Sequence, residues 1–342
     1  MEKLINELSD LRGVSGFEYL ITDKIKEKFE PYADEVYIDN LGSVVAHKKS
    51  TQANSPKIMI EAHCDEIGLM VKSITDEGFI TFTNIGGIDS RILPSLEVVV
   101  HGKEDVCGVI GIKPDFLQEE DKTAKLKDMA IDTGLELEKV KELISVGDSI
   151  TIAQSVGKLG HRQWSGKSLD DRASVAALIT VMKELSETEL FADIFAVATV
   201  QEEVGCRGAK TSAFSINPDI AIAVDVTHGI TPDNSEDAFK TGSGAIISVG
   251  PNLHPKLTQK LISICEKNNI PYDIEVSGGD TGTDAWEIQV ARNGIPTALL
   301  SIPLKYMHTS VETLDISDVK TIAKLIYEFI NDTKGDLSWL KL

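Results

Sequence analysis

Residues 199–209 read Thr199-Val200-Gln201-Glu202-Glu203-Val204-Gly205-Cys206-Arg207-Gly208-Ala209. The apolar, β-rich run over 194–200 leads directly into two adjacent carboxylates, and two glycines then turn the backbone away. This pattern is typical of a buried strand that brings charged groups to the edge of a sheet. Because successive side chains of a strand point to opposite sides, we expect Glu202 and Glu203 to have different roles. Adjacent glutamates also occur as solvated surface pairs, so the rest of the chain decides between these interpretations.

The composition is that of a folded, acidic protein. Of 342 residues, 42% are hydrophobic and 26% are charged, which is ordinary for a globular protein. The 34 basic and 54 acidic residues give a net charge of -20, and such a surface repels phosphate backbones and anionic lipids. We therefore expect neither nucleic acid nor a membrane as a partner. The N-terminus lacks the pattern of a signal peptide, and no apolar stretch is long enough to span a membrane, so a cytoplasmic location is predicted.

The four cysteines, Cys64, Cys107, Cys206 and Cys265, are scattered without a C-x-x-C pair. This scatter argues against a disulfide framework and against a zinc site made of thiolates. We expect the cysteines to pack as small apolar groups. Any metal ion would then be held by nitrogen and oxygen ligands.

Strand and helix patterns alternate in most of the chain. Apolar strands are predicted over 57–62, 194–200, 219–225 and 297–302, and helices over 175–182, 256–267 and 317–331. This alternation predicts an α/β fold in which helices flank a mainly parallel central sheet. Near the N-terminus, Ser15-Gly16 is predicted to open a helix with Ile21, Ile25 and Phe29 on its apolar face.

Residues 69–161 have a different sequence pattern. Short β-rich runs are separated by glycines and charged residues, with one helix predicted over 138–144. We therefore predict an inserted small β-barrel domain at 69–161. The main α/β domain is predicted to consist of residues 1–68 and 162–342.

Several acids and imidazoles follow buried strands or open helices. They are His63, Asp65, Asp170, Glu202, Glu203, Asp225 and His308. In an open α/β sheet the carboxyl ends of the strands line one crevice, so groups that are remote in sequence can converge there. Imidazoles and carboxylates without thiolates suit zinc, cobalt or manganese, and a shared carboxylate allows two such ions to lie about 3.5 to 4 Å apart. The sequence therefore predicts a site for two metal ions.

Each residue also has a structural interpretation. His63 can be a hydrogen-bonded histidine, Asp170 can cap the N-terminus of the following helix, and Asp225 can orient a turn. His308 can lie on an exposed loop. Together these interpretations require an acid or imidazole to fall by coincidence at the same end of several elements.

Five motifs, in order along the chain, match those of a known family. They are Ala62-His63-Cys64-Asp65-Glu66-Ile67-Gly68, Ser168-Leu169-Asp170-Asp171-Arg172, Gln201-Glu202-Glu203-Val204-Gly205-Cys206-Arg207-Gly208-Ala209, Val224-Asp225-Val226-Thr227-His228 and Tyr306-Met307-His308-Thr309-Ser310-Val311-Glu312. With these motifs the sequence resembles the TET and glutamyl aminopeptidases, family forty-two of the metallopeptidases, some of whose members were labelled "cellulase M". One small departure is Ser174, where relatives often have glycine.

The resemblance implies a ligand set for two divalent metal ions, with zinc expected and cobalt or manganese as alternatives. Asp170 looks like the bridging ligand. His63 and Asp225 would complete one metal site, and Glu203 and His308 would complete the other.

The resemblance also implies the catalytic roles. Glu202 resembles the general base, and Asp65 would hold the second ring nitrogen of His63. The two metals would activate a shared water as the nucleophile and polarise the scissile carbonyl, while Glu202 passes the water's proton to the leaving amine. Such a site would release N-terminal residues from short peptides. By similarity, the inserted domain would drive self-association into a tetrahedral homododecamer.

Other functions remain open at this point. A different metal-dependent amidohydrolase, such as a deacylase, could use a similar cleft. A glycosidase needs two carboxyl groups that flank a sugar and no histidine-bound metal pair, so sensitivity to chelators would separate it from a peptidase. The complete ligand set argues against a non-catalytic scaffold. An acid-selective pocket would need a basic group beside the first substrate side chain, and the sequence does not place one.

Overall fold

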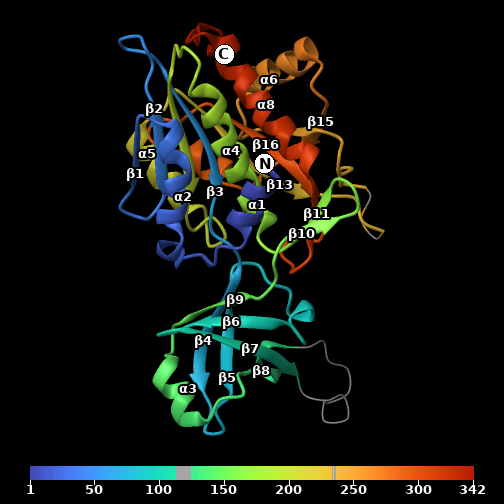
Figure 1. Cartoon of the computed structure of the whole chain (residues 1–342). Helices are drawn as coiled ribbons and strands as arrows, with labels where there is room; N and C mark the ends of the chain where they lie inside the picture. Colours follow the sequence, from blue (N-terminus) through green and yellow to red (C-terminus); the bar gives the residue numbers. More distant parts are fainter. Residues whose placement is uncertain (113–124, 233, 235) are drawn as a thin grey trace.

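The computed structural model describes residues 1–112, 125–232, 234 and 236–342. It consists of a large α/β part, which carries both termini, and a small β-barrel that projects from it (Figure 1). The chain enters the barrel after β3 (Lys57–His63) and is back in the large part at β10 (Gly157–Leu159). Within the described ranges, no helix combines the length and the apolar composition that are needed to cross a bilayer.

The large part is built on one eight-stranded sheet. Its strands, in spatial order, are β1 (Glu35–Ile38), β2 (Val44–Lys48), β12 (Asp193–Thr199), β3, β13 (Ile220–His228), β16 (Thr297–Leu304), β14 (Ala245–Val249) and β15 (Tyr272–Val276). The central strands β12, β3, β13 and β16 run parallel, as do β14 and β15. The pairs β1–β2, β2–β12 and β14–β16 are antiparallel. The predicted α/β fold is therefore confirmed, with a mixed sheet whose centre is parallel.

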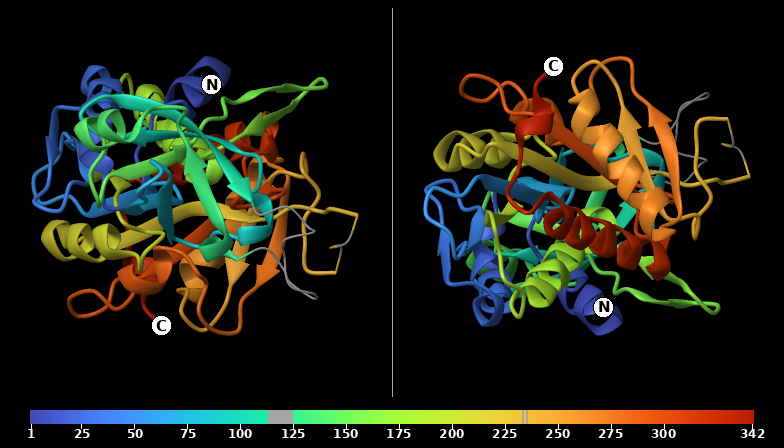
Figure 2. Two further views of the ribbon diagram at one scale, coloured as in Figure 1. Left: turned by 90° about the horizontal axis from the view of Figure 1, so that it is seen from below. Right: turned by 90° about the horizontal axis from the view of Figure 1, so that it is seen from above.

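Helices cover both faces of this sheet (Figure 2). One face carries α1 (Glu2–Ser9), α2 (Thr22–Phe29), α4 (Leu169–Leu185), α6 (Pro255–Asn268) and α8 (Ile316–Thr333), and the other carries α5 (Arg207–Ile216) and the short α7 (Ala285–Ile288). Helix α4 packs against β3 and is itself covered by α1 and α8. Because neighbours surround it, α4 is apolar on almost every side instead of amphipathic.

The barrel is closed and has its own apolar core. Its strands, in spatial order, are β4 (Gly68–Ile74), β5 (Ile80–Ile85), β8 (Met129–Asp132), β7 (Asp105–Ile112), β6 (Glu97–His101) and β9 (Ser149–Ile152), and α3 (Leu137–Leu143) packs beside them. The predicted small β-barrel is thus confirmed. Strand β10, which lies inside the predicted segment 69–161, pairs outside the barrel with β11 (Gln163–Gly166), and β11 pairs with β17 (Glu312–Asp315).

The helix predicted to open at Ser15-Gly16 begins only at Thr22, as part of α2. The preceding segment is held by tertiary contacts. Val14 forms a β-bridge with Glu66, and the buried Glu18 carboxylate accepts hydrogen bonds from the backbone N–H groups of Gly16 and Gln201, both at 2.9 Å. Residues Glu18–Leu20 form only a short 3-10 helix (η1), and the contacts of Val14 and Gln201 hold this segment outside the α-helix that the local pattern favours.

Arg172, the basic residue of the Asp-Asp-Arg motif, has a structural role. Its side chain is fully buried and donates hydrogen bonds to the backbone carbonyls of Leu8 at 2.7 Å and of Leu11 and Gly13 at 3.4 Å. Carbonyls at the C-terminus of a helix lack partners within the helix. Arg172 supplies hydrogen-bond donors to these carbonyls and thereby holds α1 and the residues after it against α4.

The cysteines do not all pack as predicted. Cys64 and Cys265 are buried, but Cys107 is exposed on the barrel and Cys206 is only partly buried. The Cys206 thiol donates a hydrogen bond to Glu202 Oε1 at 3.4 Å. The expectation of small apolar groups is therefore wrong for Cys107 and Cys206.

Candidate active site

The candidate active site lies where the parallel strands of the sheet end. His63 is the last residue of β3, Glu202 and Glu203 follow β12, and Asp225 lies near the end of β13. Asp170 comes from the start of α4 and His308 from the loop after β16. These six residues line one cleft of about 760 Å³, at the edge where an open α/β sheet binds its ligands.

The Asp170 carboxylate lies between two imidazoles. Its Oδ1 is 3.1 Å from His63 Nε2, and its Oδ2 is 3.4 Å from His308 Nε2. His308 Nε2 is also 3.3 Å from Glu203 Oε1, and His63 Nε2 is 3.9 Å from Asp225 Oδ1. Asp170 thus offers one oxygen to each of two groups of potential ligands.

The donor atoms fit divalent cations, in two overlapping groups that share His63. Two sets, His63 with Asp170 and Glu203, and His63 with Asp171 and Asp225, each offer one ligand atom per residue within 4.8 Å of one another. Both carboxylate oxygens of Asp171 are buried without a hydrogen-bond partner among the described residues. Carboxylates and imidazoles are ligands of zinc, cobalt and manganese. Asp171 has no predicted role, because an adjacent pair of acids does not reveal from sequence which of them can hold a metal.

Asp65 is fully buried behind the site and fixes the two glutamates. Its carboxylate accepts hydrogen bonds from the backbone N–H groups of Glu202 at 3.1 Å and Glu203 at 3.2 Å. The ring nitrogen Nδ1 of His63 is 3.2 Å from the backbone oxygen of Asp65 and 3.6 Å from its Oδ1. The second ring nitrogen of His63 thus contacts both the backbone oxygen and the carboxylate of Asp65, with the backbone oxygen nearer, and the expected role of the carboxylate stays a prediction.

Glu312 connects the two ends of the cluster. It is buried, and its carboxylate accepts hydrogen bonds from the backbone N–H groups of Asp170 at 3.2 Å and His308 at 3.0 Å. Glu312 therefore sets the distance between the start of α4 and the loop after β16. Sequence reasoning did not assign this role, although Glu312 ends the motif that contains His308.

The barrel also contributes to the site. The backbone oxygen of Gly87, in the loop after β5, is 2.8 Å from His308 Nδ1. This bond orients the imidazole so that Nε2 faces Asp170 and Glu203. Sequence reasoning found no site residue in the inserted segment, because a backbone carbonyl leaves no side-chain signal apart from the Gly86-Gly87 pair.

Among the described residues that line the cleft, acidic side chains outnumber basic ones. Burial raises the pKa of Glu202 to about 10 and raises the pKa values of Asp171 and Asp225 well above their usual range. Burial opposes protonation of His308, but Asp170 and Glu203 raise its pKa to about 11. Protons thus compensate part of the negative charge, and divalent cations would replace them and favour the ionised carboxylates.

Comparisons with known proteins agree on one family. The model of the M42 glutamyl aminopeptidases matches residues 42–325. The chain is 37% identical over 341 residues to the lysyl aminopeptidase of Pyrococcus furiosus, and the match covers 97% of each protein. An aminopeptidase from the archaeon Desulfurococcus kamchatkensis has a TM-score of 0.92 at 36% identity, covering 99% of this chain and 96% of that one. The TET1 peptidase of Pyrococcus horikoshii can assemble into a tetrahedron or a large octahedral shell. It has a TM-score of 0.86 at 33% identity, and the match covers 96% of this chain and 98% of that one.

We expect the chelator-treated protein to lose stability as the pH rises through neutrality. Glu202 binds its proton more tightly in the folded protein than in the unfolded chain between pH 4.5 and about 10, and His308 does so between pH 6.5 and about 11. Stability therefore falls across these windows, because the unfolded chain releases protons that the folded protein retains. Thermal unfolding from about pH 5 to about pH 9 should show a falling midpoint, and added zinc should reduce the fall. A midpoint that rises with pH in the chelated protein would contradict this account.

We expect Gly87→Ala to disturb His308 without unfolding the barrel. A Cβ at this position would lie 3.0 Å from His308 Nδ1 and 3.3 Å from Cε1, so the imidazole must shift. Groups that orient a metal ligand typically contribute about 10- to 100-fold in metal affinity, and we expect a loss of this order for zinc by calorimetry. Gly111→Ala is the matched control, because its Cβ would meet only the Ala130 carbonyl oxygen, at 3.7 Å. Equal zinc affinities of the two variants would show that the Gly87 contact is unimportant.

Proposed function

The chain belongs to the M42 glutamyl aminopeptidase family and is a hydrolase of peptide bonds, and from that premise we propose that it releases N-terminal residues from short peptides with two bound divalent metal ions. The observation that carries the proposal is the Asp170 carboxylate between the imidazoles of His63 and His308. A glycosidase would instead need two carboxyl groups that flank a sugar, without imidazoles between them.

The proposed ligand set follows the contacts of the Asp170 carboxylate and its neighbours. Asp170 bridges the two ions, His63 and Asp225 complete one site, and Glu203 and His308 complete the other. Zinc is the first candidate, and cobalt or manganese accept the same nitrogen and oxygen donors. The burial of the carboxylates supports the proposal, because several acids without cations are costly in such a place.

Glu202 is the proposed general base. When bound, the two ions would supply the Lewis acid that polarises the scissile carbonyl and lowers the pKa of the attacking water. Glu202 Oε2 lies 4.0 Å from His63 Nε2, at the edge of the ligand cluster, and Asp65 holds the Glu202 backbone. From there its carboxylate can take the proton of the attacking water and return it to the leaving amine.

The acidic cleft also favours a free peptide N-terminus. An ammonium group gains from carboxylates that are fixed nearby, whereas an acylated amine carries no charge. We therefore expect a preference for N-terminal residues over internal bonds and over the acylated substrates of a deacylase. The names of the matched proteins differ in the residue removed, because the family is described as glutamyl and the Pyrococcus furiosus relative as lysyl.

We expect Glu202→Gln to lower kcat by about 10²- to 10⁴-fold, which is the usual contribution of a general base. Glutamine keeps the shape of the side chain but cannot accept the water's proton, so the metal content should hardly change. Glu203→Gln should lose metal as well as activity, because a neutral amide is a poor ligand for a divalent ion. Hydrolysis of aminoacyl anilides and elemental analysis measure the two effects.

These two variants are each other's controls, since both remove one carboxylate charge from adjacent positions. If Glu202→Gln loses metal and Glu203→Gln keeps it, the two roles are exchanged. If neither variant changes peptide hydrolysis, the active site lies elsewhere. If N-acetylated substrates are cleaved faster than free ones, the enzyme is a deacylase.

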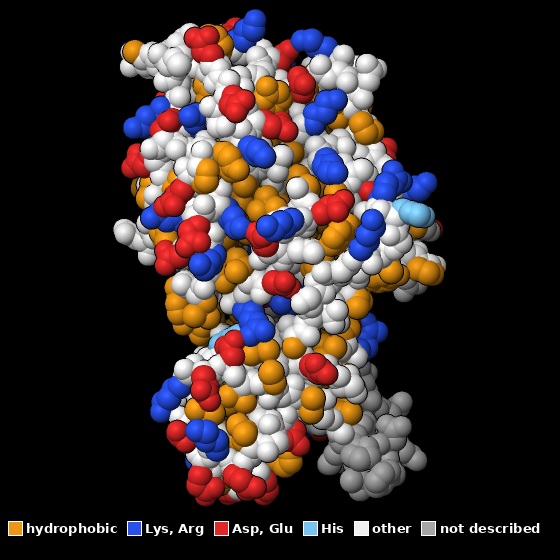
Figure 3. All heavy atoms as spheres, viewed as in Figure 1, with side chains coloured by type: hydrophobic (Ala, Val, Ile, Leu, Met, Phe, Trp, Pro, Cys, Tyr) orange, Lys and Arg blue, Asp and Glu red, His pale blue; other side chains and the backbone are white. Residues whose placement is uncertain are grey.

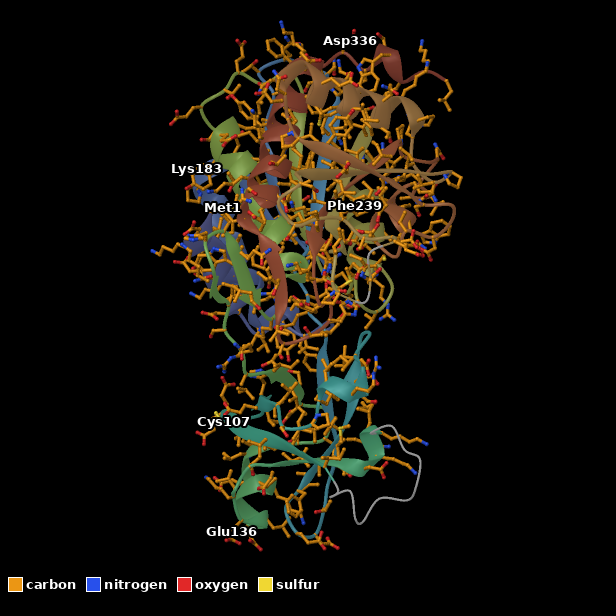
Figure 4. The ribbon with its side chains drawn as sticks, turned by 90° about the vertical axis from the view of Figure 1, so that its right-hand side faces the viewer. Met1, Cys107, Glu136, Lys183, Phe239 and Asp336 are labelled. Carbon is orange, nitrogen blue, oxygen red and sulfur yellow. The ribbon has the colours of Figure 1, made fainter. Side chains whose placement is uncertain are left out.

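We further propose that the chain forms a tetrahedral homododecamer through its barrel. The related TET1 peptidase supports self-association, because it can form closed shells. Apolar side chains on the barrel surface also support it, including Val109, which is 49% exposed, and Val146, which is 67% exposed. Figure 4 shows Cys107 on the barrel, remote from the sheet of the large part.

We expect light scattering to give a mass close to twelve times that of the chain. Most of the barrel can be removed by one deletion between Leu69 on β4 and Ile150 on β9. These two residues are paired neighbours, so a short glycine linker can join them. The excised variant should form smaller species. A full-length monomer would contradict the assembly, and an excised variant with an unchanged number of subunits would contradict the role of the barrel.

A further inference from the structure

A carboxylate outside the metal cluster stands in the wall of the cleft. Glu275 lies on β15, and its two oxygens accept hydrogen bonds from neutral hydroxyl groups, Thr227 at 2.5 Å and Ser248 at 2.7 Å. Thr227 and Ser248 are themselves buried, so the two bonds fix the carboxylate in one orientation. Glu275 also lines the cleft, which makes it available to a ligand.

The other acids that line the cleft outside the metal cluster differ from Glu275. Glu287 forms an ion pair with Lys210 at 2.6 Å, and Asp280 is exposed and accepts a hydrogen bond from the backbone N–H of Gly282 at 2.9 Å. Among the described residues that line the cleft there is no lysine or arginine. The cleft therefore presents an oriented carboxylate whose bonds come from neutral donors.

From this arrangement we infer that the cleft selects peptides with a cationic N-terminal side chain, lysine or arginine, and that Glu275 binds the cation. The inference rests on the proposed aminopeptidase function and names its substrate class. The family is described by a glutamyl substrate, which has the opposite charge, and the Pyrococcus furiosus relative by a lysyl one.

The spacing along β13 suits a lysine side chain. Asp225, a member of the metal cluster, and Thr227 lie two residues apart on β13 and therefore point to the same side of the sheet. Two residues of a strand span roughly 6.6 Å. The four-carbon stem of lysine carries its ammonium group roughly 6 Å from Cα. A residue whose carbonyl lies at the metal cluster can therefore bring its ammonium group to the carboxylate that Thr227 holds.

The charge of Glu275 predicts an order of preference among N-terminal side chains. A lysine or arginine gains an ion pair with a carboxylate that is already oriented, while a leucine leaves that carboxylate desolvated and unpaired. A glutamate would bring a like charge beside it, which is the least favourable case. Acidic and basic side chains are interspersed over the face of the molecule shown in Figure 3, whereas Glu275 places one oriented charge in the cleft.

The test is a kinetic panel of lysyl, arginyl, leucyl and glutamyl anilides with the metal-loaded protein. We expect kcat/KM for lysyl and arginyl substrates to exceed that for leucyl by roughly tenfold or more, and glutamyl to be slowest. Glu275→Gln keeps the shape of the side chain, and one of the two hydroxyls can accept from the new NH2 group instead of donating; it should lower the lysyl-to-leucyl ratio by about tenfold. Asp280→Asn is the matched control, because it removes one charge from the same cleft, and it should leave the ratio within about twofold of wild type.

Two results would overturn the inference: a leucyl or glutamyl preference in the wild-type protein, or an equal change of the ratio in both variants. Calorimetry with lysinamide and leucinamide on the Glu202→Gln variant, in which hydrolysis of these amides is slow, measures the same discrimination by binding alone. If the protein cleaves no anilide yet binds lysinamide more tightly through Glu275, the proposed function fails and the selectivity stands. If it cleaves the anilides but binds lysinamide no better than leucinamide, the inference on Glu275 fails and the aminopeptidase stands.

Discussion

The contact of the Asp170 carboxylate with the imidazoles of His63 and His308 is the interaction on which the cleft depends. It joins the end of β3, the start of α4 and the loop after β16, which are far apart in the chain. Each of these elements is fixed by packing, because β3 lies inside the sheet and α4 is covered on almost every side. Glu312 adds bonds to the backbones of Asp170 and His308. Acids buried so closely require positive charge, so the fold creates a place for cations before any substrate arrives.

The barrel is in direct contact with the cleft. The chain leaves β3 immediately after His63, forms the barrel, and on the way contributes the Gly87 carbonyl that orients His308. An insertion that served only assembly would not need to contact a residue of the cleft. Movement of the barrel relative to the large part would therefore alter the position of His308.

The local patterns predicted much of the fold, and their failures have a common cause. Continuous apolar runs located β3, β12, β13 and β16, and the short β-rich runs after residue 69 located the barrel. The helix expected from Ser15-Gly16 begins only at Thr22, because Glu18 binds Gln201, a residue remote in sequence. Strand β10 pairs with β11 outside the barrel for a similar reason, since pairing is decided between strands and not within one.

The sequence by itself determined which kinds of side chain end the central strands, because a buried strand that ends in an acid or imidazole can be recognised from local periodicity and family motifs. It determined neither the contacts of Glu312 and Gly87 nor the orientation of Glu275 by Thr227 and Ser248. These contacts were decided only by the tertiary structure. The physical reason is that each joins elements separated by long stretches of chain or uses a backbone group, and neither kind of contact leaves a periodic signal in the residues themselves.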